Sequence, residues 1–184
     1  MASSGGRVNY SRRFFWLALA IVLAGGLYTI GWFYAADRLV EEVDAGVAAL
    51  NGSGRRASCE NAEARGYPFR IGVFCRSVMY EDAGAGVSFR ARGFRSAAQV
   101  YQPNHVIGEL DAPAALAVPG IAALELDWAS LRASVRIASP LPERASVVGT
   151  DVAVRLDQAG DASPLLAQTD TIELHMRPAS EGLD

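Results

Sequence analysis

The chain has 184 residues, a mass of 19.5 kDa, a formal net charge of -3 and a pI near 5.4. This length suits one domain with a hydrophobic core, and the acidic balance argues against a nucleic-acid binder, which needs a basic surface. All 17 basic residues are arginine, so lysine-based catalysis is excluded.

The first recognisable element is an apolar run at residues 14–36, which contains 23 residues and no charge. It is long enough to cross a bilayer as a helix, and aromatic residues lie at both of its ends, as at membrane interfaces. A cleaved signal peptide is the alternative. The run exceeds the roughly 7 to 15 apolar residues of a signal core, and bulky Tyr34 precedes the nearest small-residue site, Ala35-Ala36. We therefore expect an uncleaved transmembrane anchor.

The charges that flank the anchor predict its orientation. Arg7, Arg12 and Arg13 precede it, and mainly acidic residues follow it. By the positive-inside rule, residues 1–13 are expected in the cytoplasm and the remainder outside it. Together with the bias toward Ala, Gly and Arg, this predicts a bacterial inner-membrane protein that crosses once and carries a periplasmic C-terminal domain.

Residues 37–50 continue the helical pattern beyond the anchor. Leu39, Val43, Val47 and Leu50 follow one another at four-residue steps, which places them in one stripe along a helix. The stripe packs either on the chain's own domain or, as a stalk, on a partner. Residues 51–56, rich in Gly and Asn, are expected to end the helix as a linker.

Residues 57–184 change from a helical to a strand period. Apolar and polar side chains alternate at 87–92, 131–137 and 148–157, which is typical of strands with one buried face. The last run, 169–178, alternates in the same way, so Ile172, Leu174 and Met176 are expected to be buried. Turn residues separate the runs. The turns are expected at 81–86, 101–104, 118–120, 139–143 and 158–164.

This pattern predicts a mainly β fold, in which an antiparallel meander of seven to nine strands forms a curved sheet after one transmembrane helix. The alternation changes phase near Ala129 and Ser130, which predicts a bulge or bend there. The last strand needs a neighbour on its far side. That edge is capped by a loop, paired with another chain, or left open because the domain is truncated at its C-terminus.

The two cysteines, Cys59 and Cys75, are separated by 15 residues. This spacing is not the Cys-x-x-Cys of a redox motif, and His105 and His175 lie too far away in sequence to complete a zinc site. No metal or cofactor is therefore expected. In an exported domain a disulfide is favoured, worth roughly 3 kcal/mol for a loop of this length. With a turn centred on Tyr67, Cys59 would lie opposite Cys75 in a hairpin.

The stretches "ARGYPFRIGVFC" and "AAQVYQPNHV" resemble an uncharacterised family of bacterial membrane-anchored envelope proteins with a Gly-Tyr-Pro-Phe-Arg signature. The specific part of the likeness covers about residues 55 to 110. The resemblance implies an exported β-rich domain without an established activity, and members longer than this chain. It makes the signature a structural turn rather than a catalytic loop. The signature residues are Gly66, Tyr67, Pro68, Phe69 and Arg70.

The sequence holds no nucleophile motif of the Gly-x-Ser-x-Gly kind and no phosphate-binding loop. A hydrolase would have to assemble its site from scattered residues such as His105, Glu125 and Asp127. The alternative is that these three residues are ordinary solvent-exposed residues of strands. We therefore expect no enzymatic activity, with a membrane-tethered periplasmic hydrolase as the alternative.

Four arginines fall on polar phases of two predicted strands. They are Arg90, Arg92, Arg132 and Arg136. They would form either a basic stripe that contacts lipid headgroups or an acidic partner, or an ordinary solvated face. The sequence therefore predicts a non-catalytic envelope protein that binds a protein partner or a lipid-like amphiphile. An open apolar groove in the sheet would favour the lipid, and a filled core would favour the protein.

Overall fold

The computed structural model describes residues 10–137, 144–157 and 164–177. Its contacts divide the chain into two units, residues 1–35 and 36–184. The expected turn at 139–143 and the C-terminal residues 178–184 lie outside the described residues, as does most of the expected turn at 158–164.

A single helix, α1 (Tyr10–Gly52), contains the predicted anchor and continues past it. Within the described chain it is the one helix long and apolar enough to cross a membrane. Large apolar side chains of the first unit, such as Ile21 and Leu27, are more than half exposed, as lipid contact requires. In the second unit, the predicted stripe is the less exposed side of the helix, whereas Glu42 and Asp44 are exposed.

The helix ends in a short connection that is fixed to the first strand. The Ser53 amide donates to the Leu50 carbonyl, and β1 begins at Arg55. The Asn51 side chain accepts a hydrogen bond from the Ala57 amide at 2.7 Å and donates to the Ala57 carbonyl at 3.1 Å. Asn51 thus pairs with β1 as a neighbouring strand would, which satisfies backbone groups at the sheet edge.

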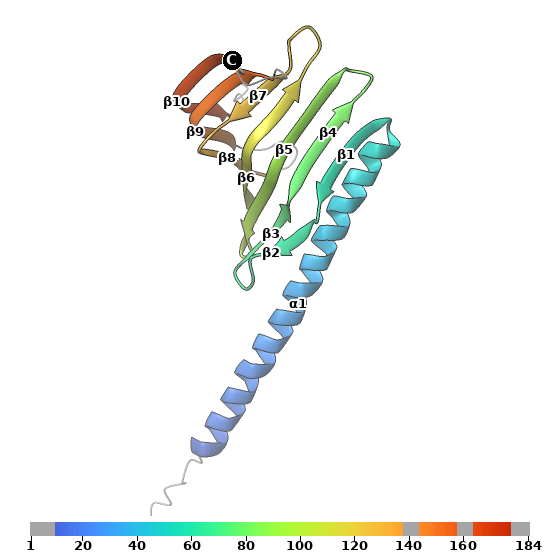
Figure 1. Cartoon of the computed structure of the whole chain (residues 1–184). Coiled ribbons are helices and arrows are strands. Elements are labelled where there is room, and N and C mark those ends of the chain that lie inside the picture. Colours follow the sequence, from blue (N-terminus) through green and yellow to red (C-terminus); the bar gives the residue numbers. More distant parts are fainter. Residues whose placement is uncertain (1–9, 138–143, 158–163, 178–184) are drawn as a thin grey trace, which may run out of the picture. The chain divides into compact units, whose positions relative to one another are not determined.

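In the described residues the helix is followed by ten strands, more than the seven to nine predicted, and all belong to one antiparallel sheet (Figure 1). They are β1 (Arg55–Glu60), β2 (Glu63–Arg65), β3 (Arg70–Cys75), β4 (Ser77–Asp82), β5 (Val87–Gln99), β6 (Gln102–Ala117), β7 (Leu124–Asp127), β8 (Ser130–Arg136), β9 (Arg144–Leu156) and β10 (Leu165–Met176).

The sheet is the predicted meander, because each strand pairs with strands close to it in sequence. The path through the sheet is β1, β4, β5, β6, β7, β9, β10. Three positions in the sheet are each occupied by two short strands, one after the other. They are β1 with β2, β3 with β4, and β7 with β8; β3 and β4 both pair with β5, and β7 and β8 both pair with β6 and β9. The mainly β, antiparallel fold after one N-terminal helix is therefore confirmed.

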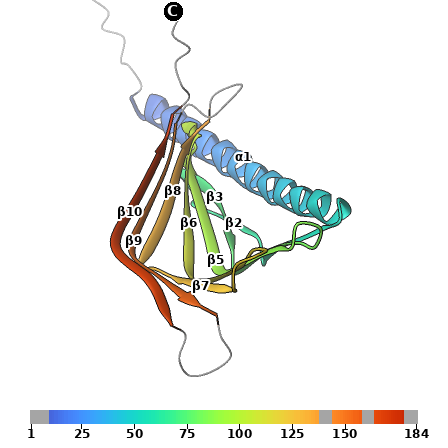
Figure 2. The ribbon, with the colours of Figure 1, turned by 90° about the horizontal axis from the view of Figure 1, so that it is seen from above.

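Irregularities in pairing accompany the curvature of the sheet (Figure 2). The β5–β6 register shifts between Ala91 and Gly93. The predicted break near Ala129 lies between β7 and β8, where the Ala129 amide donates to the Thr150 carbonyl at 3.0 Å. Extra residues on one strand of a pair increase local twist, so these positions help to curl the sheet.

The first hairpin differs from the prediction in its register. Cys59 pairs with Val78 rather than with Cys75, and nearer the turn Glu63 pairs with Phe74. The reason is the turn: the Arg70 amide donates to the Gly66 carbonyl at 2.9 Å, which closes a loop longer than one centred on Tyr67. The disulfide between Cys59 and Cys75 is nevertheless present.

The sheet has little enclosed core. Its buried cluster consists of Ala91, Ala114 and Trp128, with the Trp128 indole donating to the Leu110 carbonyl at 2.8 Å. The prediction that the last strand buries its apolar residues is wrong. Ile172 is 46% exposed, Leu174 55% and Met176 58%. Within the described residues β10 pairs only with β9, and both faces of β10 are open.

Candidate functional site

One face of the sheet carries a continuous apolar surface that crosses five strands, from β5 to β10. Residues opposite one another in an antiparallel pair project from the same face, so the registers define this surface directly. We call it the apolar face. Its three rows are Phe94, Leu110, Leu131, Gly149 and Ile172; Ser96, Gly108, Ala133, Val147 and Leu174; and Ala98, Val106, Val135, Ala145 and Met176.

The apolar face is open rather than filled. Its members on β5, β6 and β8 are half-buried, and those on β10 are exposed. Among the residues that the structure describes, no large side chain is fully buried. The face therefore matches an exposed apolar patch, a feature that marks binding surfaces in soluble domains, better than it matches one half of a packed core.

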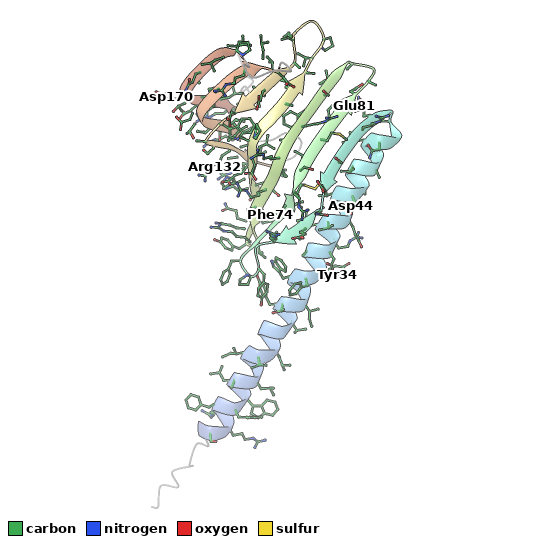
Figure 3. All side chains as sticks on the ribbon, in the orientation of Figure 1. Tyr34, Asp44, Phe74, Glu81, Arg132 and Asp170 are labelled. Atoms are coloured by element: carbon green, nitrogen blue, oxygen red, sulfur yellow. A yellow bond between two sulfur atoms is a disulfide. The ribbon has the colours of Figure 1, made fainter. Side chains whose placement is uncertain are left out.

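The opposite face of the same strands is polar. Arg95, Glu109 and Arg132 lie opposite one another on β5, β6 and β8. Arg132 forms an ion pair with Glu109 at 2.6 Å, and Arg95 contacts Asp111 at 2.6 Å and Glu109 at 3.5 Å. Figure 3 shows Arg132 among the side chains of this region. Because these charges neutralise one another, the polar face suits contact with water.

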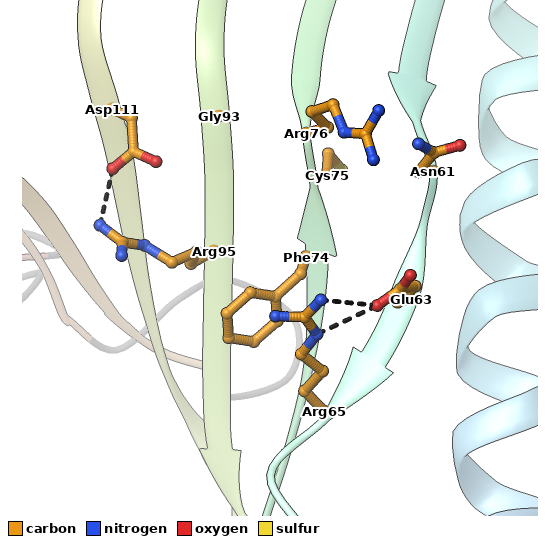
Figure 4. Close-up of a pocket in the computed structure, with 9 residues that line it drawn as sticks. All are labelled: Asn61, Glu63, Arg65, Phe74, Cys75, Arg76, Gly93, Arg95 and Asp111. Carbon is orange, nitrogen blue, oxygen red and sulfur yellow. Dashed lines mark hydrogen bonds and ion pairs between the residues drawn. The ribbon is translucent and has the colours of Figure 1, made fainter.

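A hollow of about 320 Å³ lies on this polar side, over β2, β3 and β5 (Figure 4). In it Arg65 forms an ion pair with Glu63 at 2.7 Å and holds its guanidinium 5.0 Å from the centre of the Phe74 ring. Arg95 and Asp111 complete a second pair in the same hollow. Since most of its charges are already paired, the hollow offers weak recognition to an ionic ligand.

A second hollow, of about 420 Å³, is lined by Arg90 and Arg92 with Glu125 and Asp157 over a floor of Ala and Pro. Neither arginine makes an ion pair with any residue in the described chain. Arg92 lies two residues from Phe94 on β5, an even spacing that projects both from one face. These two arginines therefore border the apolar face.

The four predicted arginines do not form one stripe. Arg92 and Arg95 are three residues apart on β5, an odd spacing, so Arg90 and Arg92 project from the face opposite Arg95 and its neighbour Arg132. Arg136 lies opposite His105 on the polar side. The sequence of β5 contains a signal for this split. The apolar residues have odd numbers at Phe89 and Ala91 and even numbers from Phe94 onward, so the apolar side of the strand changes between them.

The structure does not bring His105, Glu125 and Asp127 together. Glu125 pairs with Ala115, ten residues along β6 from His105, which corresponds to about 33 Å. His105 instead lies 2.9 Å from the Ser134 hydroxyl through Nε2. Sequence reasoning missed Ser134, because nothing in a polar strand residue signals that a histidine on the neighbouring strand faces it.

The signature turn joins β2 to β3. Gly66 has a φ of 118°, and a Cβ there would lie 2.8 Å from the Arg70 carbonyl oxygen, so glycine is required. The Tyr67–Pro68 peptide is cis. The conformations of Gly66 and of the Tyr67–Pro68 peptide thus shape the hairpin turn.

One carboxyl has a shifted pKa. Asp82, the last residue of β4, accepts a hydrogen bond from the Ala85 amide at 3.0 Å and one from Arg55 Nε at 3.0 Å. The amide first, and then the arginine, lower the pKa of Asp82 below its ordinary value of 3.8 because both stabilise the carboxylate. The described residues hold no group of three or more side chains suited to a metal ion.

Comparison with known proteins places the chain in a family. No curated protein and no solved structure matches it. A family model described as "Uncharacterized protein conserved in bacteria (DUF2125)" matches residues 32–184, which include the end of the apolar helix and the whole sheet. The match covers most of the chain, so the protein belongs to the bacterial DUF2125 family.

Proposed function

We propose that this protein is a non-catalytic, membrane-anchored envelope protein whose β-domain binds a lipid-like amphiphile on the apolar face of its sheet. The observation that carries the proposal is the row of apolar residues running without a break from Phe94 to Ile172 across five strands. An acyl chain lying on this surface would remove it from water at about 25 cal/mol per Å² of area covered.

Two arginines that form no ion pair within the described residues would supply the polar end of such a site. Arg90 and Arg92 border the apolar face and line the 420 Å³ hollow. A phosphate or carboxylate group would give each guanidinium a partner, and arginine binds both groups through paired hydrogen bonds. Arg132 already has Glu109 at 2.6 Å, so it is the weaker candidate for a headgroup contact.

Export of the β-domain to the periplasm is part of the proposal. The Cys59–Cys75 disulfide supports it, because disulfides persist in oxidising compartments. The arginines before the apolar run and the acidic residues after it support a cytoplasmic N-terminus and a C-terminal domain on the far side of the inner membrane.

Photolabelling in the membrane tests the amphiphile site. Membranes containing the full chain receive a fatty acid with a photoreactive diazirine, and labelled peptides are mapped by mass spectrometry. We expect adducts on the apolar face, above all on β9 and β10, because acyl chains would lie there. Unlabelled phospholipid should compete for them.

The chain offers a matched pair of variants for this experiment. Val147 and Val148 are adjacent on β9, but Val147 pairs with Ala133 on the apolar face and Val148 with Arg132 on the polar face. Val147→Asn should reduce labelling about tenfold, the effect of roughly 1.4 kcal/mol, and Val148→Asn should leave it unchanged. Equal labelling of the two variants, or adducts confined to residues 14–36, would contradict the proposal.

A protein partner is the second candidate, and the open edge of β10 favours it. Within the described strands β10 has β9 as its single neighbour, so its outer backbone groups are free to pair with an extended segment of another protein. Cross-linking from Thr171, on the polar side of β10, would report such a strand. A cross-link whose yield rises with protein concentration would instead identify a second copy of this chain.

The hydrolase alternative receives little support from the geometry. A Ser–His pair needs an acid that orients the histidine, and His105 contacts Ser134 without a carboxylate partner among the described residues. Under our proposal, Ser134→Ala leaves the phenotype of the gene unchanged. Loss of that phenotype in a folded, membrane-inserted Ser134→Ala protein would instead support hydrolysis.

A further inference from the structure

Two turns that are far apart in sequence lie side by side at one end of the sheet. One joins β2 to β3 and contains Phe69, and the other joins β5 to β6 and contains Val100 and Tyr101. The Val100 amide donates to the Phe69 carbonyl at 3.0 Å, and Arg70 pairs with Gln99 in the adjoining strands. The two turns are therefore joined side by side, and we call them together the tip.

This tip exposes large apolar side chains. Phe69 is 69% exposed and Tyr101 74%, and Tyr67 and Val100 are 48% and 38% exposed. Single exposed apolar residues are ordinary, but a cluster of aromatic rings at a turn marks a contact surface. Aromatic side chains favour the boundary between membrane and water, where the ring meets lipid and a tyrosine hydroxyl meets water.

The chain lengths allow the tip to reach the membrane that the anchor crosses. From Ala36, the last residue of the apolar run, to Gly52 the helix rises about 25 Å. The strand row from Arg55 to Arg65 spans about 36 Å. The row formed by β1 and β2 starts at the C-terminal end of the helix. It is longer than the helix segment from Ala36 to Gly52, so it is long enough to return to the level of Ala36.

We propose that this aromatic tip, formed by Tyr67, Phe69, Val100 and Tyr101, inserts into the interfacial layer of the lipid bilayer. The tip then gives the β-domain a second attachment to the membrane and fixes the orientation of the sheet above the bilayer. This surface is separate from the apolar face, so it holds whether or not that face binds an amphiphile.

Spin labels at the tip test the insertion. The native cysteines are joined to each other, so one added cysteine gives one labelling site. The full chain carrying Phe69→Cys or Tyr101→Cys is labelled and reconstituted into bilayers of phosphatidylethanolamine and phosphatidylglycerol. Collision rates with oxygen, which concentrates in lipid, and with a water-soluble nickel chelate are then compared. Ile121→Cys is the control, because Ile121 is 60% exposed in a turn at the other end of β6.

We expect the ratio of oxygen to nickel collisions at positions 69 and 101 to be several-fold higher than at position 121. The two tip positions lie in different turns, so each checks the other if one label disturbs the fold, and a non-reducing gel confirms that the native disulfide is intact. Ratios at 69 and 101 as low as at 121 would overturn the proposal. Labels that are immobile yet reached by neither reagent would also overturn it, because they would show that protein covers the tip.

Discussion

The two ends of the sheet are built in different ways. At the first end, β1 to β4 carry the Cys59–Cys75 disulfide, the Asn51 clamp on β1 and the ion pair between Arg55 and Asp82 at 3.0 Å. At the other end, β9 and β10 have no such brace among the described residues, and every residue of β10 is exposed.

This difference indicates a division of labour within one meander. The braced end follows directly from the helix in sequence, and its disulfide and ion pair fix the first strands to one another. The open end presents exposed apolar side chains, which the proposed amphiphile would cover. Regions of low local stability are those from which binding surfaces are commonly drawn, because they can order on binding.

Removing the disulfide should cause the largest loss of stability, and the loss should be confined to the braced end of the sheet. The double change Cys59→Ala with Cys75→Ala is expected to cost about 3 kcal/mol of unfolding free energy, the value for a loop of this length. Chemical denaturation of the detergent-solubilised protein measures the loss. Hydrogen exchange should rise in β1 to β4 and remain unchanged in β10. An equal rise in both regions would show that the staple braces the whole sheet.

Replacement of a glycine in β3 should cause the next largest loss of stability. A Cβ at Gly72 would overlap the backbone carbonyl of Ser96, whereas the nearest atom to a Cβ at Gly108 belongs to the Phe94 ring, at 3.3 Å. Gly72→Ala is therefore expected to destabilise the protein by about 2 to 3 kcal/mol, as overpacking does, and Gly108→Ala by less. Thermal unfolding compares the two. A larger loss from Gly108→Ala would mean that the open part of the sheet is the more tightly packed.

The smallest expected effect concerns the Asp82 carboxylate. Its pKa is lowered in the folded state, so its charge stabilises the protein above the ordinary value of 3.8, and this contribution is lost as the pH falls through the lower folded pKa. Asp82→Asn should therefore lower the melting temperature slightly at pH 7 and not at pH 2.5. The exposed carboxylate of Asp157 offers the control, Asp157→Asn. A deficit for Asp82→Asn that is independent of pH would assign the effect to the turn itself.

The sequence predicted the elements well because each depends on local chemistry. The length of the apolar run predicted the helix, and alternation predicted strands in β5, β8 and β9. The cysteine spacing, in a domain that was predicted to be exported, predicted the disulfide. The phase change near Ala129 even located the break between β7 and β8.

The missed features depend on long-range pairing. The register of the first hairpin shifted because the loop is closed by Arg70 and Gly66, which residue types alone do not specify. Ile172 and its neighbours alternate as buried residues do, yet alternation only separates two faces and does not say whether a second layer covers either. Arg90 and Arg132 were both assigned to the polar side of their strands. They lie on opposite faces of the sheet, because the side of β5 that carries apolar residues changes along the strand.

Hydrogen exchange with and without an amphiphile tests the central claim most directly. The full chain in lipid bilayers is compared before and after addition of a long-chain fatty acid, and peptides from β1 to β4, which lie outside the apolar face, serve as the internal reference. We expect β9 and β10 to exchange faster than the reference without the fatty acid and to slow markedly with it, and Val147→Asn to abolish the slowing. Exchange in β10 that is already as slow as in β4, or that the fatty acid does not change, would contradict an open apolar face that binds lipid.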